Sequence, residues 1–334
     1  MPLVFARLCS SHRQDRRIIS TVVLCTLISV LVLVNPLGAK NASAAAPVPV
    51  NVKVNASQSL GTLTSLSKGL NTAVWDGHLR DSATAAAVSN AGVRTLRYPG
   101  GSTSDVYHWQ SATNVAGQGY ADPNNNFDAF MGVAKATDSQ PIITVNYGDG
   151  TPQEAAGWVQ YANKGGSHYN GPVPTYTGGS STGHRYGVKY WEIGNENYGN
   201  GTYGADWEYD THPLGSSTYA TNVVAFSQAM KAVDPTINVG VVLTAPGNWP
   251  DGVTSASSPQ PWNDTVLPIA CSSIDFVVAH WYPQGPGSET DAGLLASTSQ
   301  IAAMASGLRA KVNQYCGTHA SAVKIMITET NSVY

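Results

Sequence analysis

The chain has 334 residues, a formal net charge of -3, 42% hydrophobic residues and only 12% charged residues. The hydrophobic fraction is enough to bury a folded core, which excludes a disordered chain. No triplet or heptad repeat runs through the chain, which excludes collagen and coiled coils. Beyond the N-terminal leader, Lys and Arg form no basic stripe, so we expect no nucleic-acid partner.

Residues 1–46 are predicted to be a signal peptide and linker. Four arginines precede the apolar run Ile18–Val34, and small residues follow it, with cleavage predicted after Ala44. An uncleaved membrane anchor is the alternative. Cleavage would give a secreted, extracellular protein with no stable membrane association.

Residues 47–68 are predicted to form an N-terminal strand segment, because Val48–Val54 alternates apolar and other residues. From residue 69 to 334, short apolar runs alternate with helical stretches. The predicted strands are Leu70–Trp75, Val93–Tyr98, Ile142–Tyr147, Val188–Ile193, Ile237–Leu243, Ile274–Tyr282 and Lys324–Thr328. The predicted helices are Ser82–Asn90, Phe127–Ala136, Pro152–Asn163, Tyr219–Val233 and Leu294–Tyr315.

This alternation indicates an α/β fold, a (β/α)8 TIM barrel. About seven strand–helix units are present, so we expect an incomplete barrel, truncated after the seventh strand with the eighth unit missing. A doubly wound sheet is the alternative, but no Gly-rich phosphate loop follows the first strand. The chemistry of a TIM barrel lies at the carboxyl ends of its strands.

Four of the six glutamates have ordinary explanations. Glu154 completes the capping box of a helix, and Glu208 and Glu289 fall in polar loops, where we expect them to be solvated. Glu192 lies inside the fourth strand, where we expect an ion pair with Arg97.

The remaining two, Glu196 and Glu329, end the fourth and seventh strands. Both would then lie at the same mouth of the barrel. Two carboxylates flanking a bond are what glycoside hydrolysis requires, one to protonate the leaving oxygen and one to attack the anomeric carbon. Two surface carboxylates without such a role are the alternative.

Two cysteines of the exported part, Cys271 and Cys316, are a disulfide candidate. They precede the neighbouring sixth and seventh strands, so both are expected at the amino-terminal face of the barrel. Two reduced thiols are the alternative. No Cys/His cluster has metal-ligand spacing, so we expect neither a metal nor a cofactor.

Five segments, in this order along the chain, resemble the α-L-arabinofuranosidases of glycoside hydrolase family 51, which are clan A retaining glycosidases. They are LRYPGG (96–101), VNYGDGTPQEAA (145–156), YWEIGNEN (190–197), AMKAVDP (229–235) and IDFVVAHWY (274–282). The resemblance implies that Glu196 is the acid/base and Glu329 the nucleophile. It also implies that Asn195 bonds the 2-hydroxyl of the sugar.

The same resemblance implies supporting roles for five further residues. Tyr282 would bond the nucleophile, and His280 would hold the acid/base or the sugar. Arg97 would lower the pKa of a neighbouring carboxylate. Asn146 and Trp109 would line the sugar pocket.

The activity implied is exo-α-L-arabinofuranosidase, removing side chains from an arabinose-containing polysaccharide or oligosaccharide of plants by double displacement. Another clan A retaining hydrolase, such as a β-xylosidase or endo-glycanase, and a non-catalytic carbohydrate-binding barrel are the alternatives. Family members carry Glu-His-Leu-Gly at the end of the first strand, where this chain has Asn71–Gly77. Four loop aromatics are expected to rim the leaving-group side: Trp207, Tyr209, Trp249 and Trp262.

Overall fold

The computed structural model of the protein describes residues 55–59, 62–165, 186–199, 208–285 and 287–332. The chain divides into two units, Met1–Leu60 and Gly61–Tyr334. In the described part of the first unit, Asn55 accepts hydrogen bonds from the amide and the hydroxyl of Ser57. The predicted leader and the predicted strand Val48–Val54 lie outside the described residues. None of the helices described has the length and apolarity needed to cross a membrane.

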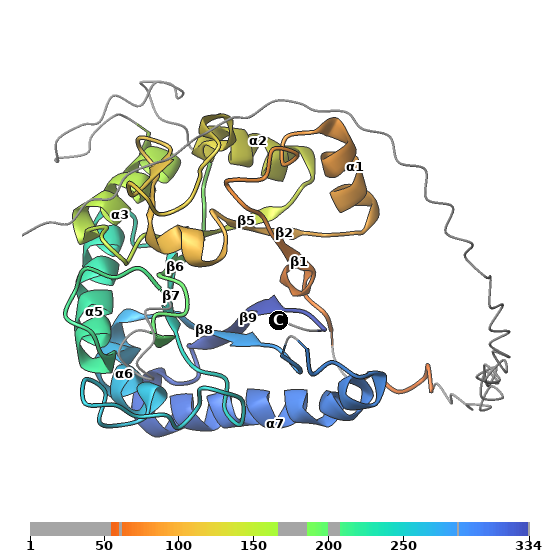
Figure 1. Cartoon of the computed structure of the whole chain (residues 1–334), viewed down its shortest axis with the longest axis vertical. Coiled ribbons are helices and arrows are strands. Elements are labelled where there is room, and N and C mark those ends of the chain that lie inside the picture. The colour runs from red at the N-terminus through yellow and green to blue at the C-terminus, as the bar shows by residue number, and fades with distance from the viewer. Residues whose placement is uncertain (1–54, 60–61, 166–185, 200–207, 286, 333–334) are drawn as a thin grey trace, which may run out of the picture. The chain divides into compact units, whose positions relative to one another are not determined.

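Seven parallel strands of the second unit form one sheet, which curves into a nearly closed barrel (Figure 1). The order in the sheet is β1-β2-β5-β6-β7-β8-β9. These strands are β1 (Gly69–Asn71), β2 (Thr95–Tyr98), β5 (Gln140–Val145), β6 (Tyr190–Ile193), β7 (Asn238–Val242), β8 (Phe276–Trp281) and β9 (Lys324–Thr330). The predicted α/β barrel with seven strand units is confirmed.

Six described α-helices lie outside the strands (Figure 1). They are α1 (Ser82–Asn90), α2 (Phe127–Ala136), α3 (Pro152–Val159), α5 (Ser216–Val233), α6 (Trp262–Ala270) and α7 (Asp291–Cys316). A small antiparallel pair, β3 (Tyr107–His108) and β4 (Thr113–Asn114), follows β2. Short helical turns are η1 (Ser65–Ser67), η2 (Gly101–Asp105), η3 (Pro123–Asn125), η4 (Gln160–Lys164), η5 (Cys271–Ser273) and η6 (Gly317–His319).

Local signals explain where α3 begins but not the presence of α6. Thr151 Oγ1 accepts the amide of Glu154 at 3.1 Å and Pro152 opens the first turn of α3, as predicted. Helix α6 contains Pro268 in its interior, a residue that normally interrupts a helix, and its sequence predicted a loop. The prediction that Trp262 rims the site is wrong, because it is buried in α6 and donates its indole N–H to the carbonyl of Val242 at 2.9 Å.

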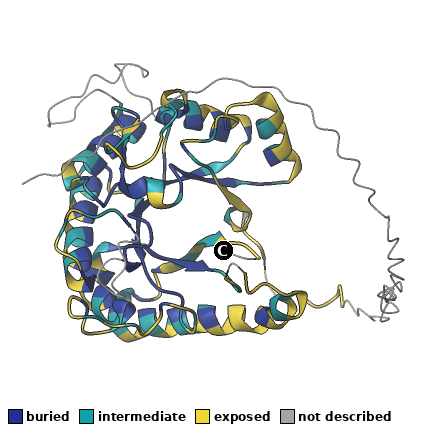
Figure 2. Ribbon diagram, in the orientation of Figure 1, coloured by how far each residue is buried: buried dark blue, intermediate teal, exposed yellow. Residues whose placement is uncertain are grey.

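Burial follows the position of each strand in the sheet. Strands β2, β5, β6, β7 and β8 are almost wholly buried, whereas at the two edges β1 is exposed and β9 is half-buried to exposed (Figure 2). Asn71 Nδ2 donates to the carbonyl of Thr328 at 3.1 Å, which connects the two edge strands. We call this junction of β1 and β9 the seam.

Candidate active site

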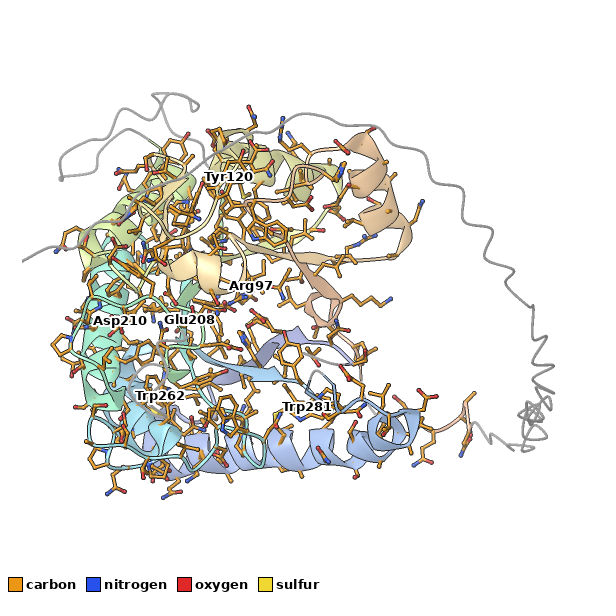
Figure 3. The ribbon with its side chains drawn as sticks, viewed as in Figure 1. Arg97, Tyr120, Glu208, Asp210, Trp262 and Trp281 are labelled. Atoms are coloured by element: carbon orange, nitrogen blue, oxygen red, sulfur yellow. A yellow bond between two sulfur atoms is a disulfide. The ribbon has the colours of Figure 1, made fainter. Side chains whose placement is uncertain are left out.

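Arg97 lies inside the barrel and connects several of its strands (Figure 3). Its Nε donates to Glu192 Oε2 on β6 at 2.6 Å, which confirms the predicted ion pair. Its Nη1 donates to Glu329 Oε1 on β9 at 2.6 Å and to Asn71 Oδ1 on β1 at 3.2 Å. Its Nη2 donates to Asn195 Oδ1 at 2.9 Å. The planar guanidinium therefore sets the positions of two carboxylates and two amides at once.

The contacts of Arg97 and Glu329 determine the charge that each of these two side chains carries. Burial by itself would lower the pKa of Arg97, but Glu192 and Glu329 raise it above its ordinary value, so Arg97 stays charged. Burial by itself would raise the pKa of Glu329, but His280, Arg97 and the hydroxyl of Tyr282 together lower it. Tyr282 donates to Glu329 Oε2 at 2.9 Å. Glu329 is therefore held as a carboxylate at neutral pH.

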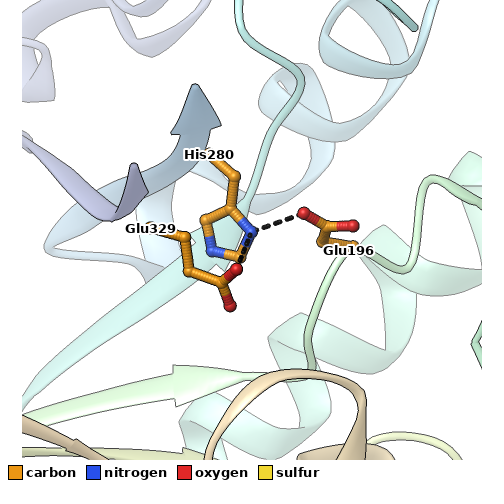
Figure 4. Close-up of side chains that lie close together, drawn as sticks. All are labelled: Glu196, His280 and Glu329. Carbon is orange, nitrogen blue, oxygen red and sulfur yellow. Dashed lines mark hydrogen bonds and ion pairs between the residues drawn. The ribbon is translucent and has the colours of Figure 1, made fainter. Parts of the chain in front are cut away.

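His280 lies between the two carboxylates Glu196 and Glu329 (Figure 4). Its Nδ1 is hydrogen-bonded to Glu196 Oε1 at 2.7 Å and lies 3.7 Å from Glu329 Oε2, while its Nε2 is hydrogen-bonded to Thr328 Oγ1 at 3.1 Å. One ligand atom from each of Glu196, His280 and Glu329 lies within 4.8 Å of the others, a spacing that a metal ion can also use. The buried charge of Arg97 beside Glu329 opposes a second cation there.

The turn after β6 presents Asn195 and Glu196 to the interior. Gly194 has φ +75°, and a Cβ there would lie 2.0 Å from the side-chain oxygen of Asn197, so this position requires glycine. Glu196 itself has φ +43°. This conformation costs free energy in a residue with a side chain, and such residues cluster at functional sites. Asp105 Oδ2 accepts the amide of Asn195 and the Nδ2 of Asn197, both at 3.0 Å, which holds the turn.

Asp105 also accepts the amide of Tyr147, after β5, at 3.2 Å, so one carboxylate positions the loops that follow two strands. Burial raises its pKa to about 8, although these hydrogen bonds oppose the rise. Our sequence reasoning missed Asp105, because an Asp in a Gly/Ser-rich segment gives no sign of burial.

The expectation that Glu208 is solvated in a polar loop is wrong. It is buried rather than solvated, and its Oε1 accepts the Nδ2 of Asn195 at 3.0 Å and the hydroxyl of Ser102 at 2.9 Å (Figure 3). Burial and the nearby Asp105 raise its pKa well above the ordinary value. Asn195 is thus held from both sides, with its oxygen on Arg97 and its nitrogen on Glu208.

Asn146 and Trp109 make their described contacts away from the two carboxylates. Asn146 Nδ2 donates to Asp149 at 2.9 Å, within the loop after β5. Trp109 is buried, stacks on Trp158 with 5.7 Å between ring centroids, and donates its indole N–H to the carbonyl of Glu154. Of the remaining loop aromatics, Tyr209 is half-buried, Trp249 is exposed and Trp207 lies outside the described residues.

No protein-family model matches the chain. The chain is 28% identical to the α-L-arabinofuranosidase C of Emericella nidulans over 207 residues, which are 59% of this chain and 39% of that protein. Among solved structures, it resembles an α-L-arabinofuranosidase from Thermotoga maritima in complex with arabinose, at 27% identity and a TM-score of 0.57. A family 51 α-L-arabinofuranosidase from Thermotoga petrophila gives 26% identity and a TM-score of 0.56.

The similarity to the Thermotoga structures covers 75% of this chain and 48% of each of those chains. The chain thus spans about half the length of these relatives, and less of the curated one. Sequence and fold nevertheless agree on the same group of proteins. Over part of its length, the chain is a distant homologue of the family 51 α-L-arabinofuranosidases.

Proposed function

We propose that the protein is a retaining glycoside hydrolase in which Glu196 is the acid/base and Glu329 the nucleophile. The observation that carries this proposal is the spacing of the two carboxylates, which bring one oxygen each to within 4.8 Å of each other. Retaining enzymes hold their carboxyl groups about 5–5.5 Å apart, whereas inverting enzymes need about 6.5–9.5 Å to admit a water molecule.

The two glutamates have environments that suit different tasks. Glu329, whose pKa is lowered beside Arg97 and Tyr282, is ready to attack the anomeric carbon as a carboxylate. Glu196 is hydrogen-bonded to His280. This hydrogen bond fixes one oxygen of Glu196, and the proton for the leaving group is carried on the other oxygen.

The reaction then has two steps. Glu329 attacks the anomeric carbon, and the bond to the leaving oxygen breaks as Glu196 transfers its proton to that oxygen. The product of this step is a sugar esterified to Glu329. Glu196, now a carboxylate, removes a proton from water, and the hydroxide attacks the same carbon and frees Glu329.

We propose that the substrates are α-L-arabinofuranosides at the non-reducing ends of plant polysaccharide side chains. We also propose that the protein is secreted. The arabinose complex of the Thermotoga maritima relative supports the sugar, and the Arg-rich apolar leader supports export. The end of β1 differs from the family pattern. At this position the side chain of Asn71 accepts a hydrogen bond from Arg97 and donates one to the carbonyl of Thr328.

The test compares Glu329→Ala with Glu196→Ala on arabinofuranosides of graded leaving-group acidity. Glu329→Ala should lose activity on every substrate, because no covalent intermediate forms. Glu196→Ala should retain its first step on acidic leaving groups, which need no proton, and azide should restore its turnover. Exposed Glu289→Ala serves as the matched control and should retain full activity.

Three results would contradict the proposal. Equal loss in both glutamate variants on every leaving group, without azide rescue, would overturn the assignment of the two roles. Activity of the parent protein on xylopyranosides alone would favour the β-xylosidase alternative. Binding of polysaccharide without turnover of any glycoside would favour a non-catalytic barrel.

A further inference from the structure

A cavity of about 750 Å³ lies between the end of helix α2 and the beginnings of three strands. In its described lining, Arg94 directly precedes β2, Gln140 opens β5 and Gly187 precedes β6. Glu196 and Glu329 lie at the carboxyl ends of their strands, so the cavity and the proposed active site are on opposite faces of the barrel. Its volume is within the ~300–1,000 Å³ typical of small-molecule sites.

Two cationic side chains, Arg94 and Lys135, line this cavity. Neither of them forms an ion pair with any residue that the structure describes. Arg94 Nη1 donates to the carbonyl of Val93 at 2.8 Å, which uses one of the five N–H donors of the guanidinium. The other donors of Arg94 and the ammonium of Lys135 therefore remain for an anion.

The fold positions both cations. The amide of Arg94 donates to the carbonyl of Lys68 at 2.9 Å, and its carbonyl accepts the amide of Gln140 at 2.8 Å, so its backbone is joined to both neighbouring strands. Lys135 lies in the last turn of α2, where a cation complements the helix dipole. The dipole does not account for Arg94, which precedes a strand.

The other walls are largely apolar and are held in place by the protein itself. The hydroxyl of Tyr186 donates to Asp128 Oδ1 at 2.8 Å, and its ring packs edge-on against Phe127 with 5.5 Å between centroids. Met131 and Pro141, both buried, also line the cavity. A ligand that fits these walls has apolar C–H faces in addition to its charge, as a pyranose ring with a carboxylate does.

The charges of the lining limit the charge of the ligand. Asp138 is the carboxylate among the described lining residues, so the two cations leave an excess of one positive charge. The whole chain, in contrast, has a net charge of -3. A ligand with a single carboxylate balances the excess charge, whereas Asp138 opposes a densely charged polyanion.

We propose that this cavity binds a saccharide that carries one uronate group, with its carboxylate on Arg94 and Lys135 and a ring against Tyr186. The planar fork of Arg94 matches a carboxylate. The choice of a saccharide rests on the proposed function, because uronates are the acidic sugars of plant polysaccharides. The bound sugar would anchor the barrel to its polymer while the opposite face stays open to the substrate.

Calorimetry with glucuronosyl-xylotriose and xylotetraose tests this site, because the two ligands have the same number of rings and differ in charge. The parent protein should bind the acidic ligand about tenfold more tightly at low ionic strength, and high salt should reduce this preference. Exposed Lys135→Glu should abolish the preference. Arg94→Lys, which keeps the charge but loses the fork, should weaken it by about threefold.

The matched control is Lys231→Gln, because Lys231 pairs with Asp275 at 2.7 Å and lies outside the described lining. It should bind both ligands as the parent does. Equal affinity of the parent for the two saccharides, or an equal loss of preference in Lys231→Gln and Lys135→Glu, would overturn the inference. Tighter binding of inorganic phosphate or of phosphatidylglycerol vesicles than of glucuronosyl-xylotriose would also overturn it.

Hydrolysis of arabinofuranosyl fluoride separates this inference from the proposed function. Lys135→Glu should leave kcat/KM on the fluoride within about twofold of the parent value, because the cavity is remote from the two glutamates. A larger loss would contradict a site independent of catalysis. Absence of hydrolysis by the parent protein would refute the proposed function, while the binding comparison would still decide whether the cavity takes a uronate.

Discussion

Among the described residues, two donate hydrogen bonds to Glu329: the neutral hydroxyl of Tyr282 and the cationic guanidinium of Arg97. The hydroxyl of Tyr282 stabilises the ionised carboxylate and so contributes to the lowered pKa of Glu329. The same ring lines a cavity beside Glu196. Replacing only the hydroxyl separates these two contributions.

Tyr282→Phe should raise the pKa of Glu329, because the carboxylate loses a hydrogen bond that its protonated form does not need. The acidic limb of the kcat/KM profile should then move to higher pH by about one unit, the equivalent of a hydrogen bond to a charged group. Tyr190→Phe is the control, since Tyr190 packs on Phe276 within the barrel wall. An acidic limb at the same pH in Tyr282→Phe and the parent would contradict this account.

At the scale of elements, His108 joins β3 to the beginning of α3. Its Nδ1 lies 3.0 Å from Glu154 Oε1, and its Nε2 lies 3.5 Å from Asp149 Oδ2 in the preceding loop. Hydrogen bonds to Asp149 and Glu154 raise the pKa of His108 from 6.5 to about 10. The charged imidazolium therefore binds the antiparallel pair to the loop after β5.

The pKa of His108 is higher in the folded than in the unfolded protein, so the folded state binds the extra proton. Its contribution to stability is complete below about pH 6.5 and is lost as the pH rises to about 10. His108→Gln should lower the melting temperature at pH 6, and the difference from the parent should shrink at pH 10.

The control for this prediction is His319→Gln, because the ring of His319 bonds the backbone carbonyl of Ile274. This contact involves no carboxylate, so the control measures the loss of a histidine hydrogen bond without an ion pair. A constant difference between His108→Gln and the parent from pH 6 to 10 would show that His108 stabilises the protein by packing alone.

At the scale of the whole barrel unit, the disulfide Cys271–Cys316 joins the chain before β8 to the end of α7. The two Cα atoms are 5.2 Å apart, and 45 residues separate the cysteines along the chain. Both cysteines precede strands, so the bond lies at the face opposite the site. The last two strands, one of them at the seam, are thereby tied together.

Reduction of this bond should destabilise the protein by at most about 4 kcal/mol, because the unfolded chain regains the entropy of a 45-residue loop. The melting temperature should fall, while kcat/KM at 25 °C stays unchanged. Calorimetry and kinetics on Cys271→Ala/Cys316→Ala would measure both quantities. Two free thiols titrated in the unfolded, unreduced protein, or a loss of activity on reduction at 25 °C, would contradict the prediction.

The sequence by itself determined the elements that depend on local patterns. Buried parallel strands produce continuous apolar runs, so all seven strands were predicted within a few residues, and the cap at Thr151 marked the start of α3. Helix α6 and the exact end of β1 were not predictable in this way. Pro268 obscures the helical pattern of α6. Beyond the end of β1, Thr72 and Val74 still donate their amides to the carbonyls of Arg97 and Pro99, so the apolar run outlasts the strand.

The position of Glu196 and Glu329 at strand ends also followed from the sequence, because parallel strands bring their carboxyl ends to one mouth. Only the tertiary structure decided the surroundings of these groups. Glu208 and Asp105 are buried because loops distant in the sequence converge on them, and Arg97 contacts residues that follow or lie in three other strands. Burial, and with it the pKa of each carboxyl group, depends on such non-local contacts, which no window of the sequence contains.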